Sequence, residues 1–280
     1  MKKLYIEPTA GLANRMRGIT SALTVKQRTK CDVFCIWIPY SGLNSEFEDL
    51  FEPINGLKIY KEKIFGNIAS SFRPKIYRGI PVKIRNKFYH NLDLVINNHD
   101  FNNYFIPNEI KMFDFIKRYK NVYIETCHEF DRNGINFFKE FIPVKAIQDK
   151  INAIVSSFTS ESVIGVHIRR GDHKKAMQNS PVSLFYEAIE KEISKNEKVK
   201  FFLATDDVEI EKSLKEKYPK KIIVSVKVLD RNSKQGIQDA VVDMFCLANT
   251  QKIYGSYWSS YSETAAKIYN KELIILQDNR

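Results

Sequence analysis

Regular alternation of apolar runs with amphipathic segments is the feature of this sequence that most limits its fold. Five short apolar runs occupy 163–168, 199–204, 222–226, 252–254 and 273–276. The segments between them, at 184–194, 208–217, 237–249 and 259–269, space their apolar residues as helices do. Short runs rich in Val and Ile are typical of strands buried in a parallel sheet, and the helical segments provide the crossovers. The second half of the chain is therefore predicted to be a doubly wound α/β unit.

The first forty residues predict a second unit of the same class. A strand at 3–7, a loop containing Gly11, a helix at 16–30 and a strand at 33–38 form a β–loop–α–β pattern. Between residues 42 and 118 the pattern is less regular and matches no known motif. We place a domain boundary near residue 145, which gives an N-terminal Rossmann-like domain (1–145) with an irregular insertion and a C-terminal Rossmann-like domain (146–280).

Composition is typical of a globular protein. The chain has 280 residues, of which 44% are hydrophobic, and this is enough for two cores. The sequence contains no run of eighteen apolar residues and no long apolar stretch before Glu7, so we expect neither a membrane span nor a signal peptide. The four cysteines show no metal-ligand spacing, as expected for reduced thiols. We therefore expect a cytoplasmic protein. Peripheral contact with the inner face of the membrane is compatible with this location.

The net charge of +11 is spread over many lysines. A solvated basic surface is the simplest interpretation, and nucleotides, anionic lipids, acidic glycans and nucleic acid are the candidate partners. Residues 65–91 mix aromatic side chains with Lys and Arg. We favour a surface excursion whose aromatic side chains face the core, with an acceptor-binding or membrane-surface role as the functional alternative.

The strand at 163–168 ends in a group of polar residues. His167 and Arg169 share one face of that strand, Arg170 and Gly171 follow, and Asp172 and His173 complete the group. Ligands of α/β proteins bind beyond the carboxyl ends of strands, and two guanidinium groups suit a diphosphate. Gly171 would let the backbone approach a ligand closely. The structural alternative is an Arg–Asp ion pair that closes the strand end.

Polar residues also follow two other strands of this half, and all three groups should lie at one sheet edge. These residues are Thr205, Asp206 and Asp207 in one group and Tyr257, Trp258, Ser259 and Ser260 in the other. Hydroxyl and N–H groups at a helix N-terminus stabilise phosphate, although ordinary helix caps explain Asp and Ser equally well. Asp243 lies within an apolar helix, where a carboxylate must be paired or face a ligand such as a base edge.

Motifs for other chemistries are absent from the sequence. It has no DxD between strand and loop, no HExxH, no clustered His, no GxSxG and no Walker A motif. We therefore expect no metal site, and expect arginine rather than Mg²⁺ to neutralise any bound phosphate. His128 beside Glu129 could serve acid–base chemistry, but a structurally satisfied His is the more common case.

Four motifs in order resemble the α1,2/α1,6- and protein-O-fucosyltransferase superfamily, in particular its NodZ-like and α1,6-fucosyltransferase branch. Residues 167–172 resemble the first motif, HxRxxD, and 202–207 resemble the second. The third runs from Asp243 through Ser259 to Ala266. Residues 11–15 resemble the N-terminal loop GGLxNR, with an Ala-Gly start in place of Gly-Gly.

This resemblance implies a GT-B-like fold with two Rossmann-like domains facing across a cleft, of which 1–145 would be the acceptor-side domain and 146–280 the nucleotide-sugar-binding domain. It also implies a metal-independent, inverting fucosyltransferase (EC 2.4.1.-) that moves L-fucose from GDP-fucose to a glycan and needs no further cofactor. A bacterial surface polysaccharide or a lipid-linked oligosaccharide is the expected acceptor, and no nucleic acid is expected as a partner. The alternatives are a glycosyltransferase for another nucleotide sugar and a non-catalytic basic protein that binds glycans or nucleic acid.

The resemblance also implies roles for single residues. Arg169 would grip the β-phosphate, and Asn14 and Arg15 would lie near the donor or the acceptor. His167 and Asp243 would contact guanine or ribose, and Ser259 and Ser260 would hold the diphosphate. Arg170 and Asp172 would order the site. The remaining residues of the donor region would be Gly11, Thr205, Asp206, Asp207, Tyr257 and Trp258. The α1,6 branch has a Lys and then a Glu after the first motif, where this chain has His173 and Met177. His173 is therefore the candidate base, and Asp172 is its competitor.

Overall fold

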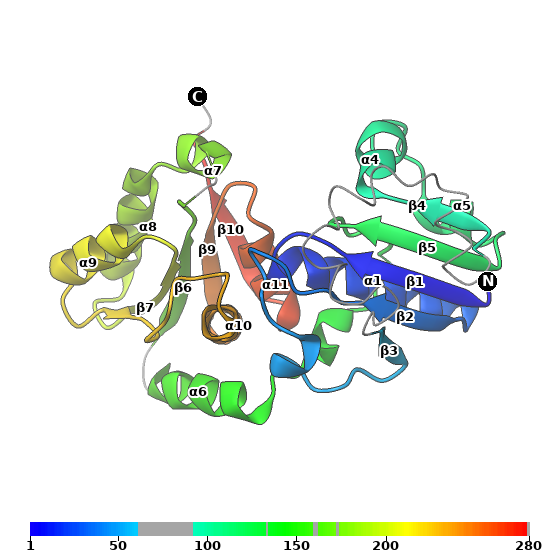
Figure 1. Cartoon of the computed structure of the whole chain (residues 1–280). Coiled ribbons are helices and arrows are strands. Elements are labelled where there is room, and N and C mark those ends of the chain that lie inside the picture. The colour runs from blue at the N-terminus through cyan, green and yellow to red at the C-terminus, as the bar shows by residue number, and fades with distance from the viewer. Residues whose placement is uncertain (61–91, 133, 159–161, 172–173, 279–280) are drawn as a thin grey trace. The chain divides into compact units, whose positions relative to one another are not determined.

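The computed structural model describes residues 1–60, 92–132, 134–158, 162–171 and 174–278. Its contacts divide the chain into two compact units: one comprises Met1–Ile142 with Arg231–Lys234, and the other comprises Pro143–Asp230 with Gln235–Arg280. Figure 1 shows that each unit is built on its own sheet. The basic and aromatic segment 65–91 lies outside the described residues.

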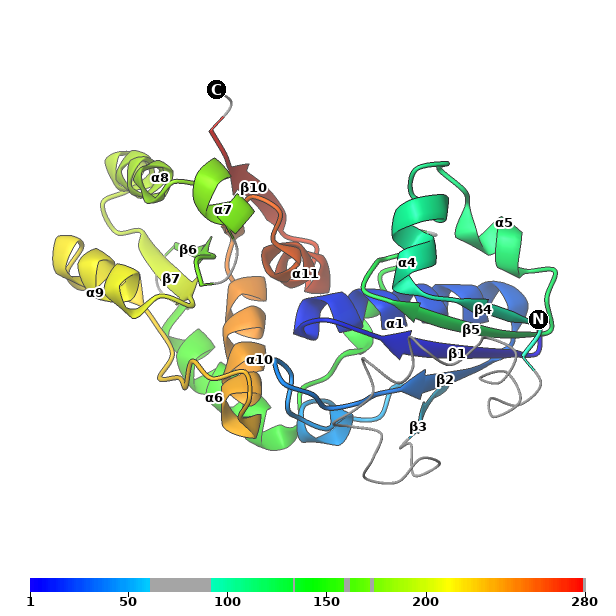
Figure 2. The same ribbon diagram turned by 45° about the horizontal axis from the view of Figure 1, so that its top comes forward.

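The first unit contains a five-stranded parallel sheet in the order β3-β2-β1-β5-β4. Its strands are β1 (Lys3–Pro8), β2 (Asp32–Ile36), β3 (Leu57–Tyr60), β4 (Leu94–Ile96) and β5 (Asn121–Thr126). The helical segments are α1 (Leu12–Thr29), η1 (Phe47–Asp49), α4 (Asn98–Asp100), η2 (Phe101–Phe105), α5 (Met112–Ile116) and η3 (Phe137–Glu140). Figure 2 shows α4 and α5 near β4 and β5. The irregular middle of the sequence thus adds strands at both edges of this sheet.

The helix α1 begins at Leu12 rather than at the predicted Met16. Gly11 is its N-cap residue, and the Arg15 N–H donates to the Gly11 carbonyl at 3.1 Å. Asn14 and Arg15 therefore lie in the first helical turn and not in the loop. Leu12, Met16, Ile19 and Leu23 are buried along the helix, because this apolar stripe packs against the sheet.

The second unit contains a parallel sheet in the order β10-β9-β6-β7-β8. Its strands are β6 (Val163–Ile168), β7 (Lys200–Thr205), β8 (Ile222–Ile223), β9 (Lys252–Ser256) and β10 (Glu272–Leu276). The helical segments are α6 (Lys145–Val155), η4 (Ser156–Phe158), α7 (Lys174–Asn179), α8 (Val182–Lys195), α9 (Val208–Lys217), α10 (Lys234–Ala248) and α11 (Ser260–Ile268). Every residue of β6 is buried, as expected for a central parallel strand. The predicted α/β class and the strand–helix alternation are confirmed.

Both sheets change winding direction once. In the first unit the chain builds β1, β2 and β3 outward and then continues on the other side of β1, with β5 beside it. In the second unit it builds β6, β7 and β8 and then places β9 on the other side of β6. The carboxyl ends of β1 and β5, and of β6 and β9, are therefore topological switch points, where α/β proteins bind ligands. No helix among the described residues is long and apolar enough to cross a bilayer.

Candidate functional site

The β6–β9 switch point brings together the polar groups that follow these two strands. Ser256 joins the two strand ends, because its hydroxyl accepts from the Arg169 N–H at 2.9 Å and donates to the His167 carbonyl at 3.2 Å. Ser256 is fully buried at the end of β9. The predicted convergence of the Arg169 group and the Tyr257–Ser260 group at one sheet edge is therefore observed.

Arg169 forms an ion pair with Asp206, which follows β7. The same carboxylate accepts from the backbone N–H of Arg170 at 2.7 Å. The side chains of Arg169 and Asp206 are 15% and 23% exposed, so the pair lies at the surface of the edge rather than in the core. The structural alternative considered from the sequence is thus realised, and Asp206 fixes the direction of the guanidinium. A guanidinium carries five N–H donors in a rigid fork, so one carboxylate contact is compatible with a bound phosphate.

Arg170 supports the edge from below. It is buried, and its guanidinium donates to the carbonyls of Ser180 at 2.7 Å and Arg169 at 3.1 Å. The Ser180 hydroxyl in turn donates to the Leu276 carbonyl and accepts from the Tyr257 N–H at 2.8 Å. Burial lowers the pKa of Arg170. Arg170 therefore links the loop after β6, through Ser180, to the ends of β9 and β10.

Two backbone conformations at this edge are unusual. Gly171 has a φ of +31°, and a Cβ there would lie 2.7 Å from Oδ2 of Asp206. Trp258 has a φ of +55° although it is not glycine, and its side chain is 60% exposed. The Nζ of Lys175 lies 4.0 Å from the centre of the Trp258 ring. Trp258 lies at this edge because it follows β9 and precedes α11. Asp172 and His173 lie outside the described residues.

His167 is buried beneath the edge. Its ring stacks on Tyr261 with 4.9 Å between ring centres, and its buried Nδ1 has no hydrogen-bond partner among the described residues. Burial, reinforced by the positive charges of Arg169 and Lys227, lowers the pKa of His167 to about 3. The imidazole is therefore neutral near pH 7. Buried polar atoms are nearly always hydrogen-bonded, so Nδ1 marks a place where a ligand could supply the missing partner.

The N-terminus of α11 completes the edge. Ser259 is at the N-cap position, but its side chain makes no capping hydrogen bond. The nine-residue helix therefore lacks a cap from the Ser259 side chain, and its dipole favours an anion at this end. Ser260 begins the helix, and Tyr257 and Trp258 precede it. The ordinary Ser cap that the sequence allowed is not observed at this helix.

Asp207 and Thr205 serve local structure. Asp207 caps α9 by accepting from the N–H groups of Glu209 at 2.9 Å and Ile210 at 3.1 Å. The Thr205 hydroxyl accepts from the Asp207 N–H at 3.2 Å. The capping alternative is therefore observed for Asp207. The contacts of both residues described here are with the N-terminus of α9 and the turn before it.

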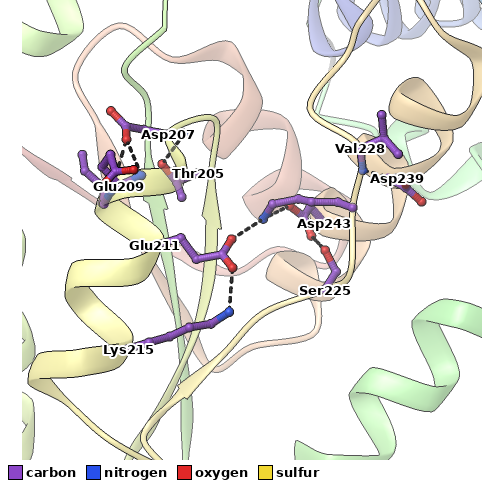
Figure 3. Close-up of polar contacts among 11 residues, drawn as sticks. Thr205, Asp207, Glu209, Glu211, Lys215, Ser225, Val228, Asp239 and Asp243 are labelled. Carbon is purple, nitrogen blue, oxygen red and sulfur yellow. Dashed lines mark hydrogen bonds and ion pairs between the residues drawn. The ribbon is translucent and has the colours of Figure 1, made fainter.

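Asp243 lies in a buried charge network rather than alone in its apolar helix (Figure 3). Its carboxylate accepts from Ser225 and from Lys227, whose Nζ is 3.0 Å away. Lys227 also lies 3.6 Å from Glu211, and its side chain is only 7% exposed. Burial raises the pKa of Asp243, while Lys227 and Ser225 oppose that shift. A nucleotide base that reached Asp243 would therefore meet a carboxylate that Lys227 already holds.

The loop after β1 holds the other predicted residues. Ala10 has a φ of +63°, which explains why this position favours glycine. A Cβ at Gly11 would meet no atom within 4 Å, and α1 has no side-chain cap. Asn14 is partly exposed and accepts from Nη1 of Arg17 at 3.4 Å. Gly11 and Asn14 thus remain accessible at their sheet edge.

Arg15, in contrast, is buried in the fold. It is 2% exposed, its Nη2 donates to the Ile38 carbonyl at 2.6 Å, and its Nε donates to the Ala10 carbonyl at 3.2 Å. Its guanidinium carbon lies 4.5 Å from the ring centre of Trp37 and 5.1 Å from that of Tyr40. Burial lowers the pKa of Arg15 to about 10, so the group stays cationic near neutral pH. These contacts give Arg15 a supporting position beneath the β1–α1 loop.

Sequence reasoning missed several residues that shape the site. Ser180, Tyr261 and Lys227 all contact residues that it identified. Ser and Tyr carry no pattern that marks such contacts, and Lys227 lies sixteen positions from Asp243. No group of three or more His, Cys, Asp or Glu side chains in the described part of the chain could hold a metal ion.

Comparison with known proteins identifies the fold. No family model matches the chain, and no curated protein matches it by sequence. A structure of NodZ alpha-1,6-fucosyltransferase soaked with GDP-fucose matches with a TM-score of 0.65 and 18% identity over 96% of this chain and 93% of that one. Arabidopsis thaliana FUT1 in complex with GDP matches with a TM-score of 0.64 and 14% identity over 98% of this chain and 70% of that one. POFUT1 in complex with GDP-fucose matches with a TM-score of 0.57 and 11% identity over 98% of each chain.

These likenesses extend over nearly the whole chain and include both units. They confirm the predicted GT-B-like α/β fold class, and the matched structures are those of fucosyltransferases.

Proposed function

We propose that the chain is a GDP-fucose-dependent fucosyltransferase whose donor diphosphate binds at the β6–β9 edge. The observation that carries this proposal is that Arg169 follows β6 and the N-terminus of α11 follows β9 at one topological switch point, where Ser256 joins the two strand ends. Three of the matched structures were solved with GDP or GDP-fucose bound, and they share the fold. The order of the four motifs supports the same donor.

The chemistry of the step fits these groups. The bond between the fucose C1 and the β-phosphate oxygen breaks, so negative charge grows on the departing GDP while the sugar becomes oxocarbenium-like. A positioned guanidinium and helix N–H groups stabilise such charge, at roughly 3–4 kcal/mol for a well-placed donor. An acceptor hydroxyl attacks C1 from the opposite face, which inverts the β-linked donor to an α-fucoside, and its proton passes to a base. His173 and Asp172 are the candidate bases.

Recognition of the base is assigned to His167 and Asp243. The Nδ1 of His167 lacks a partner among the described residues, and Asp243 is bound by Lys227. Donation by a guanine edge to Asp243 would require the Lys227 contact to be shared or moved. Lys227 itself could donate to a carbonyl of the base, and such carbonyls occur in uracil as well as in guanine. UDP is therefore a necessary comparison with GDP.

The remaining assignments belong to the same proposal. The reaction would need neither a metal ion nor a further cofactor, and the acceptor would be a glycan, such as a bacterial surface polysaccharide or a lipid-linked oligosaccharide. The enzyme would act in the cytoplasm or at the inner face of the membrane, and nucleic acid would not be a partner.

Thermal unfolding with GDP, UDP and ADP, each with and without EDTA, tests the donor assignment. A ligand that binds the folded state raises the midpoint, by an amount equivalent to about 2.7 kcal/mol at a hundredfold excess over Kd. We expect a shift that is selective for GDP, insensitive to EDTA and lost in Arg169→Ala. Arg118→Ala removes the same charge from the exposed surface of the first unit and serves as the control. A preference for UDP or ADP would overturn the donor, and no shift with any nucleotide would overturn the proposed function.

A further inference from the structure

The β1–β5 switch point of the first unit contains a pocket of about 230 Å³. Arg17 of α1 lies on one side of it, and His128, Glu129 and Phe130 follow β5 on the other. The η2–α5 segment supplies the remaining walls, including Phe101 and Phe105. The pocket therefore crosses the crevice where the strand order reverses, the position at which open α/β sheets bind ligands.

The walls of the pocket are aromatic. Phe101 and Phe105 are 3% and 6% exposed, and their ring centres are 5.8 Å apart. Phe101 also lies 6.1 Å from Phe130 and 5.7 Å from His128, between ring centres. Binding sites are typically lined by apolar and aromatic groups, with a few polar groups that fix the orientation of the ligand. The C–H face of a pyranose ring is an apolar surface that packs on such aromatic rings.

Four polar side chains line the same pocket, namely Arg17, Glu109, His128 and Glu129. The Nε2 of His128 lies 3.1 Å from Oδ1 of Asn102, and burial together with the charge of Arg17 lowers the pKa of His128. The imidazole is therefore neutral at pH 7 and can accept a hydrogen bond from a hydroxyl group. Glu129 is paired with Arg132 at 2.8 Å. Arg17 donates and Glu129 accepts, so the pocket provides both kinds of hydrogen-bond partner that sugar hydroxyls require.

Hydrogen bonds connect the segments around the pocket to the β1–α1 loop. Asn98 donates to the Thr9 hydroxyl at 2.8 Å and accepts from the Cys127 N–H at 2.9 Å, which ties together the chain segments after β1 and β5. Arg17 reaches Asn14 at 3.4 Å. The pocket and the accessible residues Gly11 and Asn14 thus belong to one edge of the first sheet.

We propose that this pocket binds one uncharged pyranose unit of the acceptor glycan, with its apolar face on the half-buried Phe130, which Phe101 backs, and its hydroxyls toward Arg17, His128 and Glu129. The volume is below the about 300–1,000 Å³ of pockets that hold drug-sized ligands, which suits a single ring. The carboxylates of Glu109 and Glu129 also line the pocket, and they offset the cation of Arg17, so an acidic sugar gains no advantage. The assignment to an acceptor rests on the proposed transferase function.

Saturation-transfer NMR on the whole chain tests the pocket. The probes are the methyl β-pyranosides of glucose, galactose, N-acetylglucosamine and mannose, with methyl glucuronide as the acidic comparison. Ile106 lines the pocket and is 51% exposed, so Ile106→Arg can fill the pocket without a large cost in folding. Tyr104 is 52% exposed in the neighbouring segment and does not line the pocket, so Tyr104→Arg is the matched control.

We expect at least one uncharged glycoside to give a signal with the wild type and with Tyr104→Arg, and none with Ile106→Arg. His128→Ala should weaken binding of that glycoside by about tenfold, the equivalent of one lost hydrogen bond. Stronger binding of the glucuronide, no signal from any uncharged glycoside, or a signal that persists in Ile106→Arg would overturn the proposal. GDP binding is measured on the same samples: its absence would refute the donor site, whereas the glycoside signals alone decide the pocket.

Discussion

The two switch points of the molecule have the same strand arrangement but different side chains around them. The β6–β9 edge contains Arg169, the neutral imidazole of His167 and the N-terminus of α11, which Ser259 does not cap. At the β1–β5 edge the arginine of the motif is buried between Trp37 and Tyr40, and aromatic rings line the nearby pocket. In the proposals made above, the first edge binds a diphosphate and the second a neutral sugar ring. Arg169 is partly exposed at its edge, whereas Arg15 is buried beneath its loop.

The largest expected effect is that of Arg169→Ala on fucosyl transfer. Loss of the guanidinium removes stabilisation of the departing diphosphate, so turnover should fall by on the order of a hundredfold or more. The initial rate of GDP release from GDP-fucose with an acceptor measures this, and thermal unfolding checks that the variant is folded. A near-normal rate would remove Arg169 from the mechanism and erase the proposed difference between the two edges.

The second prediction contrasts the two histidines at low pH. His167 has a folded pKa of about 3, below its usual value of about 6.5, so the unfolded chain binds more protons between these pH values. Stability should therefore fall as the pH drops below 6.5, by roughly 2–3 kcal/mol at pH 4.5 from this residue.

Urea unfolding of the wild type and His167→Gln at pH 6.5 and 4.5 measures this contribution. His128→Gln should change the pH dependence in the same direction but by less, because burial lowers the pKa of that half-buried group less severely. Equal slopes in the wild type and His167→Gln would contradict the assignment of a buried neutral imidazole.

Arg15→Met should lower stability and leave nucleotide binding intact. The change removes charge-assisted hydrogen bonds to buried carbonyls, although it also removes a buried charge, so a net loss of about 1–3 kcal/mol is expected. Urea unfolding gives the stability, and calorimetry gives the affinity for GDP. Loss of GDP binding with unchanged stability would contradict this prediction and indicate that Arg15 contacts the donor.

The smallest expected effect is that of Ala10→Gly. Ala10 adopts a φ of +63°, and this conformation costs an L-residue about 1–2 kcal/mol, whereas glycine adopts it freely. Glycine loses more entropy on folding, so the net gain in stability should be about 1 kcal/mol or less. A lower unfolding midpoint for Ala10→Gly would show that the loop does not hold this strain.

The sequence allowed much of the second unit to be predicted, because strongly apolar runs determine buried strands and their polar ends then share an edge. It could not decide whether Arg169 binds Asp206 or a ligand, since both uses need the same residues. The Asp243–Lys227 pair was missed because it joins residues that are close only after folding. The segment from α4 to α5 was missed because its helices are short and β4 has only three residues.

Calorimetric titration of GDP and guanosine into the wild type and Arg169→Ala tests the donor site most directly. The two ligands share the base and the ribose and differ in the diphosphate. We expect the preference for GDP over guanosine to shrink by about tenfold or more in the variant, the equivalent of one charge-assisted hydrogen bond, while guanosine binds as before. An unchanged preference, or an equal loss for both ligands, would contradict a diphosphate site at the β6–β9 edge.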